Sequence, residues 1–248
     1  MDRTVTDEIK TIVQTIGENK LKYEILLFDA DNTVLDFDKA EEQALCRAFR
    51  DMGLKFCDNT LKVYRKNNVN QWQLFEKGLL TKPQVLVSRF ELTFRDLGFP
   101  MDIAKQTGDL YEEYLKLGFF VVPHAEEVLA KLQSTRRLYV VSNGVAEIQN
   151  SRMKGSGLEK YFIARFVSET VGYPKPQIEY FDYCFKHIEN FAKSKTLIIG
   201  DSLTSDIQGG VNAGIDTCWF NPTHAKNNSQ LCPAYEIDDL RQLFEIIK

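Results

Sequence analysis

The sequence predicts an α/β fold, in which a doubly wound parallel sheet carries an inserted all-helical domain. Apolar runs without polar alternation recur along the chain, which is typical of strands covered on both faces. Helical patterns separate the later runs, as in parallel sheets with helical crossovers. A long interval after the first run holds helical patterns but no strand. With 248 residues, 44% of them apolar, the chain can build a large core with such an insertion.

Five runs are predicted to be strands. They cover Glu24–Asp29, Arg137–Ser142, Phe162–Ser168, Thr196–Gly200 and Thr217–Phe220. A short amphipathic helix is expected within residues 1–20, ending near Gly17 and packing on the parent domain, because four apolar side chains recur there at helical spacing. These are Ile9, Ile12, Val13 and Ile16.

The interval between the first two strands predicts four helices, each opened by a capping side chain and ended by a glycine. The opening residues are Asp38, Asp58, Thr81 and Asp102, and the closing glycines are Gly53, Gly78, Gly98 and Gly118. We therefore expect a core domain of residues 1–35 and 122–248. Residues 36–121 should form a helical cap domain, joined to the core by two linkers.

Composition narrows the class of partner. The net charge is −4 without a basic block, which argues against a nucleic acid polymer or an anionic membrane as partner. No apolar run approaches the ~20 residues that span a bilayer. Charged residues at positions 2, 8 and 10 predict that no signal peptide is present. Five scattered cysteines without a CxxC pair predict free thiols and a cytoplasmic location.

The first strand ends in two carboxylates, Asp29 and Asp31. A carboxylate can attack phosphorus and form an acyl phosphate. A second carboxylate two residues later can donate a proton to the leaving oxygen and then accept one from water. Like charges this close raise one of the two pKa values, which favours a protonated acid. Taken alone, such a pair is a weak signal, and a turn or a solvated pair is the alternative.

Two later segments suit phosphate binding. Ser142 ends the second strand before Asn143 and Gly144, where a hydroxyl and backbone N–H groups could hold phosphate oxygens beside a helix N-terminus. Lys175 lies between two prolines, which restrict its backbone and aim its ammonium. That charge could neutralise a transition state. The alternatives are an ordinary strand-to-helix turn and a lone surface lysine.

Another acid pair, Asp201 and Asp206, follows the fourth strand. The carboxylates of Asp29 and Asp201, with a backbone carbonyl of Asp31, would form the oxygen site that Mg²⁺ prefers. A capping aspartate and a turn are the alternative for this segment. Ligands of open α/β sheets bind beyond the carboxyl ends of the strands, where all of these segments would meet.

In this order, the acid pair, hydroxyl, lysine and second acid pair match the four signature motifs of the haloacid dehalogenase-like hydrolase superfamily. The resemblance extends from about Glu24 to the C-terminus, and the helical insert resembles the C1-type cap that this superfamily adds to its Rossmannoid core. It implies that Asp29 is the nucleophile and Asp31 the general acid and base. It also implies phosphate binding by Ser142, Lys175 and the backbone N–H of Asn143.

The resemblance further implies a Mg²⁺ site held by Asp29, Asp31 and Asp201, which Asp206 completes directly or through water. Dehalogenases of this superfamily use no metal and lack the second acid, so Asp31 and the Asp201 segment favour phosphoryl transfer. Hydrolysis is favoured over phosphomutase activity, because nothing in the sequence indicates protection of the phosphoryl group from water. A non-catalytic binding protein is a further alternative, which the four intact motifs disfavour.

The expected substrate is a small phosphate monoester. The stretch from Asn67 to Gly78, followed by Arg89, resembles the cap of noncanonical pyrimidine nucleotidases, which implies a pyrimidine nucleoside 5′-monophosphate. Trp72 or Phe75 could stack on the base and Asn68 could meet its edge. Alternatively, both aromatic residues belong to the cap core, and the enzyme is a phosphoglycolate or sugar-phosphate phosphatase. The sequence does not indicate an oligomeric state.

Overall fold

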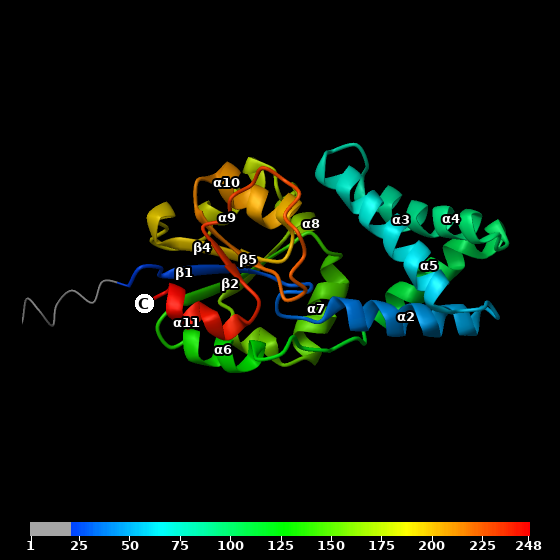
Figure 1. The fold of residues 1–248 in the computed structure, drawn as a ribbon, viewed down its shortest axis with the longest axis horizontal. Helices are drawn as coiled ribbons and strands as arrows, with labels where there is room; N and C mark the ends of the chain where they lie inside the picture. The colour runs from blue at the N-terminus through cyan, green and yellow to red at the C-terminus, as the bar shows by residue number, and fades with distance from the viewer. Residues whose placement is uncertain (1–20) are drawn as a thin grey trace, which may run out of the picture.

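The structure is a computed structural model that describes residues 21–248, so the helix expected within residues 1–20 lies outside the described part. A six-stranded sheet with helices on both faces stands beside a separate group of helices (Figure 1). The strands are β1 (Ile25–Asp29), β2 (Arg137–Ser142), β3 (Ala164–Val167), β4 (Thr196–Gly200), β5 (Asp216–Phe220) and β6 (Tyr235–Ile237).

All strands of the sheet run parallel, in the order β3-β2-β1-β4-β5-β6. The predicted doubly wound sheet is confirmed, with β1 paired to β2 on one side and to β4 on the other. The sequence prediction missed β6, a three-residue edge strand that is too short to give an apolar run. It also extended β3 by two residues at its start and one at its end.

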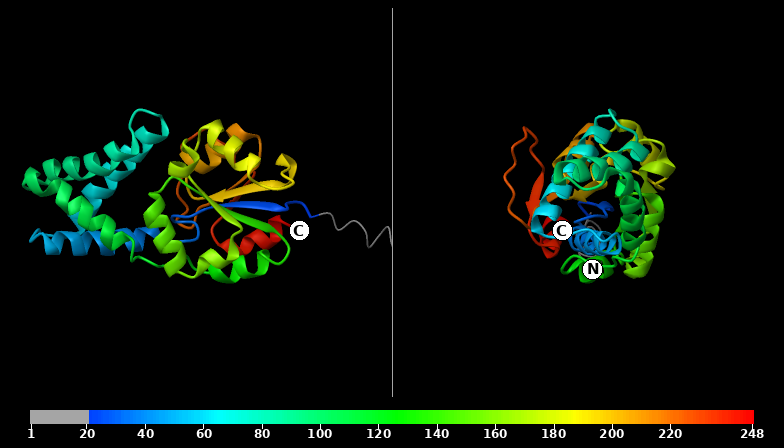
Figure 2. Two further views of the ribbon diagram at one scale, coloured as in Figure 1. Left: turned by 180° about the vertical axis from the view of Figure 1, so that it is seen from behind. Right: turned by 90° about the vertical axis from the view of Figure 1, so that its right-hand side faces the viewer.

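Helices cover both faces of the sheet, as the two turned views in Figure 2 show. Alternate residues of β1 face opposite cores: Leu26 and Phe28 join one apolar cluster, and Ile25 and Leu27 join the other. One face is covered by α6 (Ala125–Leu132), α7 (Ala146–Gly155) and α11 (Leu243–Ile246), and the other by α8 (Ser168–Val171), α9 (Ile178–Lys186) and α10 (Gln208–Ala213). Because each β1 side chain is buried, the strand reads as a continuous apolar run.

The inserted segment is helical as predicted. It forms α2 (Phe37–Asp51), α3 (Asp58–Glu76), α4 (Lys82–Leu97) and α5 (Ala104–Leu115) around an apolar cluster that Ile148 of α7 joins from the core. Thr81 caps α4 with a reciprocal capping box, as expected. The other predicted starts were shifted: Asp36 rather than Asp38 caps α2, Cys57 precedes α3, and a short 3₁₀ turn (Met101–Ile103) replaces the Asp102 cap before α5.

The chain crosses between the sheet and the helical insert twice, and the two crossings lie side by side. Leu35 and Val121 form an antiparallel bridge. The Asp36 N–H donates to the Phe120 carbonyl at 3.0 Å, and the Val122 N–H donates to the Val34 carbonyl at 3.1 Å. We propose that this paired crossing is the boundary between the core domain and the cap of residues 36–121. In residues 21–248, no helix has the length and apolarity to cross a membrane.

The cap cluster depends on Phe49, which is fully buried and packs with the rings of Phe56, Phe94 and Phe99. Replacing it by alanine should lower the free energy of unfolding by about 3–5 kcal/mol, because the ring leaves a cavity. Urea unfolding followed by circular dichroism measures this change. Val69→Ala, at a half-exposed position on α3, is the control and should stay within about 0.5 kcal/mol of the parent protein. Equal effects of the two substitutions would contradict the assigned packing.

Candidate active site

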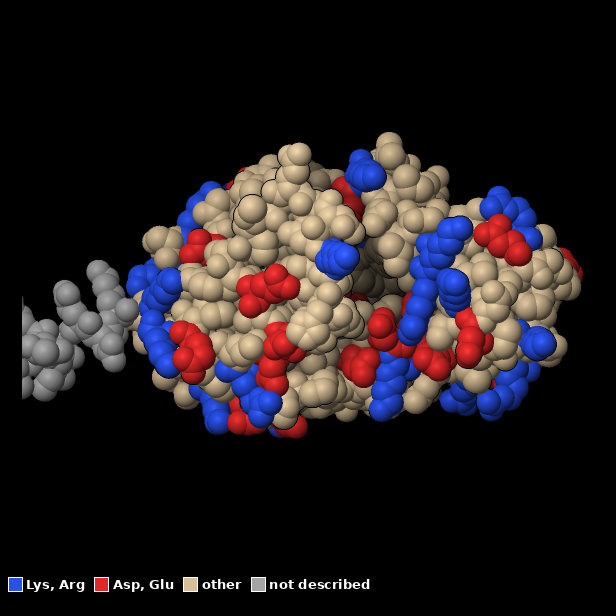
Figure 3. Space-filling view, viewed as in Figure 1, with Lys and Arg blue, Asp and Glu red and all other residues tan. Residues whose placement is uncertain are grey.

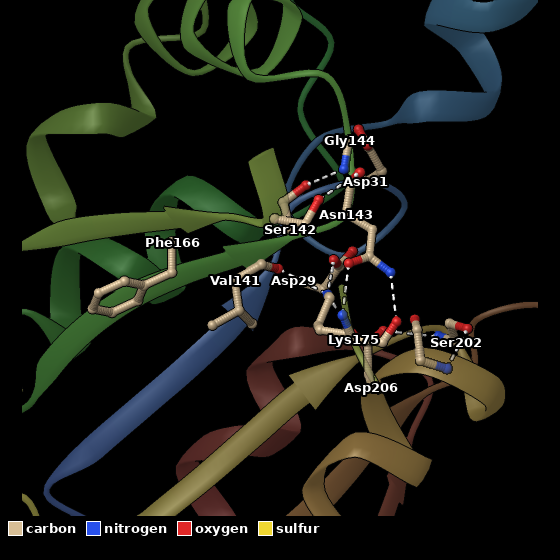
Figure 4. Close-up of polar contacts among 12 residues, drawn as sticks. Asp29, Asp31, Val141, Ser142, Asn143, Gly144, Phe166, Lys175, Ser202 and Asp206 are labelled. Atoms are coloured by element: carbon tan, nitrogen blue, oxygen red, sulfur yellow. Dashed lines mark hydrogen bonds and ion pairs between the residues drawn. The ribbon is translucent and has the colours of Figure 1, made fainter. Parts of the chain in front are cut away.

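The carboxyl ends of three neighbouring strands bring the predicted motifs together. Asp29 is the last residue of β1, Ser142 is the last residue of β2, and Asp201 directly follows β4. Lys175 comes from the loop between α8 and α9 and points to the same place, as Figure 4 shows. Parallel pairing aligns these strand ends at one edge of the sheet, so segments more than 100 residues apart meet.

A buried lysine lies at the centre of this group. The Lys175 side chain is 1% exposed, and its ammonium donates to three oxygens: Asp29 Oδ1 at 2.6 Å, Asp206 Oδ1 at 2.6 Å and the Val141 carbonyl at 2.9 Å. All three of its protons therefore have an acceptor. Burial alone would lower the Lys175 pKa, but the two carboxylates outweigh it, and the pKa is raised. The lysine stays charged and holds the two acidic segments together.

Three carboxylates beside this lysine form a cluster that fits a cation. Oxygen atoms of Asp29, Asp201 and Asp206 lie within 4.8 Å of one another. Burial, together with the Asp206 and Asp31 carboxylates, raises the pKa of Asp29 to about 8 against the opposing charge of Lys175. Burial and the carboxylates of Asp29 and Asp206 hold the pKa of Asp201 well above its usual value. A hard divalent cation with oxygen ligands, such as Mg²⁺, would relieve this crowding.

Local backbone structure fixes Asp206 in the cluster. It lies in a single π-helical turn, Leu203–Ile207, which Ser202 caps by accepting from the Ser205 N–H at 3.2 Å. The Ser202 N–H donates to Asp206 Oδ2 at 3.1 Å, so both carboxylate oxygens of Asp206 are bound. A Cβ at Gly200 would lie 2.2 Å from Asp206 Oδ2, so only glycine lets this carboxylate pack against the end of β4.

The loop after β2 is braced from within the core. Ser142 Oγ accepts from the Gly144 N–H at 3.0 Å. The Asn143 side chain forms a reciprocal pair with the backbone of Lys175: its Oδ1 accepts from the Lys175 N–H at 2.8 Å, and its Nδ2 donates to the Lys175 carbonyl at 2.9 Å. The sequence pointed to Asn143 for its backbone N–H. The structure adds that its side chain ties the loop to the lysine segment.

Asp31 is positioned by two residues that the sequence analysis missed. Its carboxylate accepts from Gln149 Nε2 at 2.5 Å and from Arg152 Nη1, both on α7. Arg152 is fully buried, and its Nε also donates to the carbonyl of Gly118 at 3.0 Å, in the linker from the cap. The available signal was a glutamine and an arginine three residues apart on a face of α7 that is otherwise apolar. The Asp31 carboxylate thus lies outside the three-carboxylate cluster.

A cavity of about 190 Å³ extends from this cluster to the cap. Figure 3 shows the hollow between the two parts of the molecule. Its walls include all the predicted catalytic residues and, from the cap, Asn68, Trp72, Glu76 and Arg89. Phe75, which the sequence analysis placed with the base-binding residues, does not line this cavity. It packs edge-on against Trp72 with ring centroids 5.6 Å apart.

Comparison with known proteins identifies one family. Residues 26–220 match the family model of the haloacid dehalogenase-like hydrolases. A solved structure of HAD-hydrolase YfnB from Bacillus subtilis, described as bound to magnesium and as revealing interdomain movement, is 40% identical to this chain. It covers 91% of this chain and 98% of its own, with a TM-score of 0.86.

Two curated relatives are named as pyrimidine 5′-nucleotidases. PynA from Streptococcus pneumoniae is 36% identical, over 91% of this chain and 95% of its own length. YjjG from Escherichia coli is 29% identical, over 92% of this chain and 99% of its own length. The similarity to both relatives therefore spans the cap as well as the core.

The crowding of carboxylates predicts the effect of Asp201→Asn. Without added metal, this variant should unfold at a temperature about 2–4 °C higher, the shift that about 1 kcal/mol produces in a chain of this size, because one like charge is removed. Added Mg²⁺ should raise the unfolding temperature of the parent protein but not of the variant. Differential scanning fluorimetry measures both, with Asp182→Asn, at an exposed position on α9, as control. A variant that keeps the full Mg²⁺ response would contradict the assignment of Asp201 to the cation site.

Proposed function

The chain belongs to the haloacid dehalogenase-like hydrolases, and from this premise we propose that it is a Mg²⁺-dependent phosphomonoesterase, specifically a 5′-nucleotidase for pyrimidine nucleoside monophosphates, including noncanonical ones. One observation carries the proposal: the Lys175 ammonium binds Asp29 beside the Asp201 and Asp206 carboxylates, at the base of a cavity that reaches the cap. A nucleophile, a cation site and a charge for phosphate thus share one cavity.

In the proposed mechanism, Asp29 attacks the phosphorus atom of the substrate. Lys175 binds Oδ1 of Asp29. Among the contacts of the described residues, Oδ2 is therefore the oxygen left for the attack. The new bond joins Oδ2 to phosphorus, and the bond from phosphorus to the ribose 5′-oxygen breaks. Ser142 and the loop N–H groups would bind the other phosphate oxygens, while the Lys175 charge offsets the negative charge that develops. Asp29, Asp201, Asp206 and the Asp31 carbonyl would hold Mg²⁺, which would supply further charge neutralisation.

Asp31 would transfer the protons. It gives one to the leaving 5′-oxygen, then takes one from the water that attacks the aspartyl-phosphate, and inorganic phosphate departs. Both of its oxygens are bound to α7 in the structure, so this role requires Asp31 to exchange one of these partners for the leaving oxygen. Closure of the cap would exclude bulk water during the transfer.

The cap residues that line the cavity support a pyrimidine base as the part of the substrate that the cap recognises. Asn68 is 5% exposed, and its amide is fixed between two charged groups: Oδ1 accepts from Arg89 Nη1 at 3.3 Å, and Nδ2 donates to Glu41 Oε1 at 3.1 Å. Beyond these two contacts, the Asn68 amide keeps one N–H proton and one oxygen lone pair. These groups suit the hydrogen-bonding edge of a pyrimidine. The Trp72 ring on the same wall would offer a stacking surface. The names of the two nucleotidase relatives agree with this choice.

A substrate panel tests the specificity. With Mg²⁺, the purified protein should release phosphate from dUMP, dTMP and UMP with a kcat/KM at least about tenfold above that for phosphoglycolate or hexose phosphates. The cap wall supplies hydrogen bonds and a stacking surface to a base, and one such contact suffices for this ratio. Malachite-green detection of phosphate, with and without EDTA, measures both the preference and the metal requirement. Preference for phosphoglycolate or a sugar phosphate would replace the nucleotidase assignment by that alternative.

Asp29→Asn tests the nucleophile. An amide cannot form the acyl phosphate, so kcat should fall by at least about 10³-fold. Burial raises the pKa of the Asp29 carboxyl, so the neutral replacement should leave the fold intact, which circular dichroism checks. Asp102→Asn, at an exposed cap position, is the control and should retain full activity. Unchanged turnover in the Asp29 variant would refute the mechanism.

A further inference from the structure

One cap lysine reaches into the core close to the active site without lining its cavity. Lys82 is the first residue of α4, and it is 8% exposed. Its ammonium donates to the Gly144 carbonyl at 2.7 Å and to Ser168 Oγ at 2.9 Å, and it pairs with Glu169 Oε1 at 3.2 Å. All three partners belong to the core, so the two hydrogen bonds and the ion pair of the ammonium all cross the boundary between cap and core.

The acceptors of Lys82 are joined to the phosphate-binding loop. Ser168 Oγ donates to the Asn143 carbonyl at 3.3 Å, and Glu169 Oε2 accepts from the Ala146 N–H at 3.1 Å. Gly144 belongs to that loop itself. Lys82 therefore contacts the core where β2 and β3 end, whereas the paired linkers follow β1 and precede α6.

The cap aims this lysine with its own local structure. Thr81 and Gln84 form the capping box that starts α4, and Pro83 restricts the backbone of the first turn. Phe75 lies beneath the ammonium, with its ring centroid 5.7 Å from Nζ. A cation at a helix N-terminus opposes the helix dipole, so helix stability does not account for a lysine at this position. Its bonds to the core do account for it.

The energetics suit a reversible contact. Burial lowers the pKa of Lys82, against the raising effect of Glu169, because an ammonium loses hydration when the cap meets the core. Two charge-assisted hydrogen bonds and the ion pair with Glu169 offset that loss, and the net free energy of such a buried pair is small. When the cap opens, water can hydrate Lys82 and Glu169 again. Neither the closed nor the open arrangement is then strongly disfavoured.

We propose that Lys82 is a positioning residue that latches the cap onto the core beside the phosphate-binding loop. The inference rests on the proposed function, since it assigns the latch to the closure that sequesters a nucleotide. The loop does not need Lys82 for its own shape, because Ser142 and Asn143 brace it from within the core. Losing the latch should therefore lower kcat/KM more for substrates that need the cap than for substrates that do not.

Lys82→Met tests the latch while keeping the length and apolar stem of the side chain. The kcat/KM for dUMP should fall by about tenfold or more, as expected for the loss of charge-assisted hydrogen bonds, whereas that for p-nitrophenyl phosphate should change by less than about twofold. Small-angle scattering should give a larger radius of gyration for the variant, because the open cap extends the molecule. Lys62→Met, at an exposed position on α3, is the matched control and should change neither quantity.

Glu169→Gln examines the same contact from the core. It should lower kcat/KM for dUMP by less than Lys82→Met does. Adding it to Lys82→Met should lower kcat/KM little further, because the pair acts as a unit. Equal losses on both substrates, or unchanged scattering, would overturn the latch. If the parent protein released phosphate from no substrate, the proposed function would fail instead, and the scattering comparison would still decide whether Lys82 holds the cap.

Discussion

The contact of one buried ammonium with two carboxylates organises this molecule. Lys175 holds Asp29 at the end of β1 and Asp206 in the turn after β4, each at 2.6 Å. Without that charge, three carboxylates within 4.8 Å would oppose folding of the strand ends around them. With it, the site retains an excess of negative charge that a divalent cation can neutralise. The same charges that make this region costly to fold make it suited to phosphoryl transfer.

Other contacts hold the charged residues of this site in place. Gly200 lets Asp206 pack against the end of β4, and the Asn143 amide fixes the backbone on both sides of Lys175. Arg152 and Gln149 hold Asp31 from α7. Arg152 also binds the Gly118 carbonyl in the linker, so the acid of the first motif is connected to the route by which the cap joins the core.

The cap meets the core at the paired linkers, where Leu35 and Val121 form a bridge, and at the proposed Lys82 latch. From the cap, Asn68, Trp72 and Arg89 present polar and aromatic groups to the cavity. The core would supply the phosphate chemistry and the cap would supply recognition of the rest of the substrate, so the position of the cap relative to the core couples the two.

The sequence alone determined the sheet, the helical insert and the residues that converge. Continuous apolar runs mark strands buried on both faces. Aspartates and a serine at the ends of such runs, and a lysine between two prolines, are visible without coordinates. Parallel pairing then aligns the strand ends at one edge of the sheet. Only the tertiary structure decided the positions of Gln149, Arg152 and Lys82, since their partners lie 62 to 121 residues away and no local pattern records them. It also set Phe75 behind Trp72. Side chains three residues apart share a helix face, but the packing of neighbouring elements decides which of them reaches a cavity.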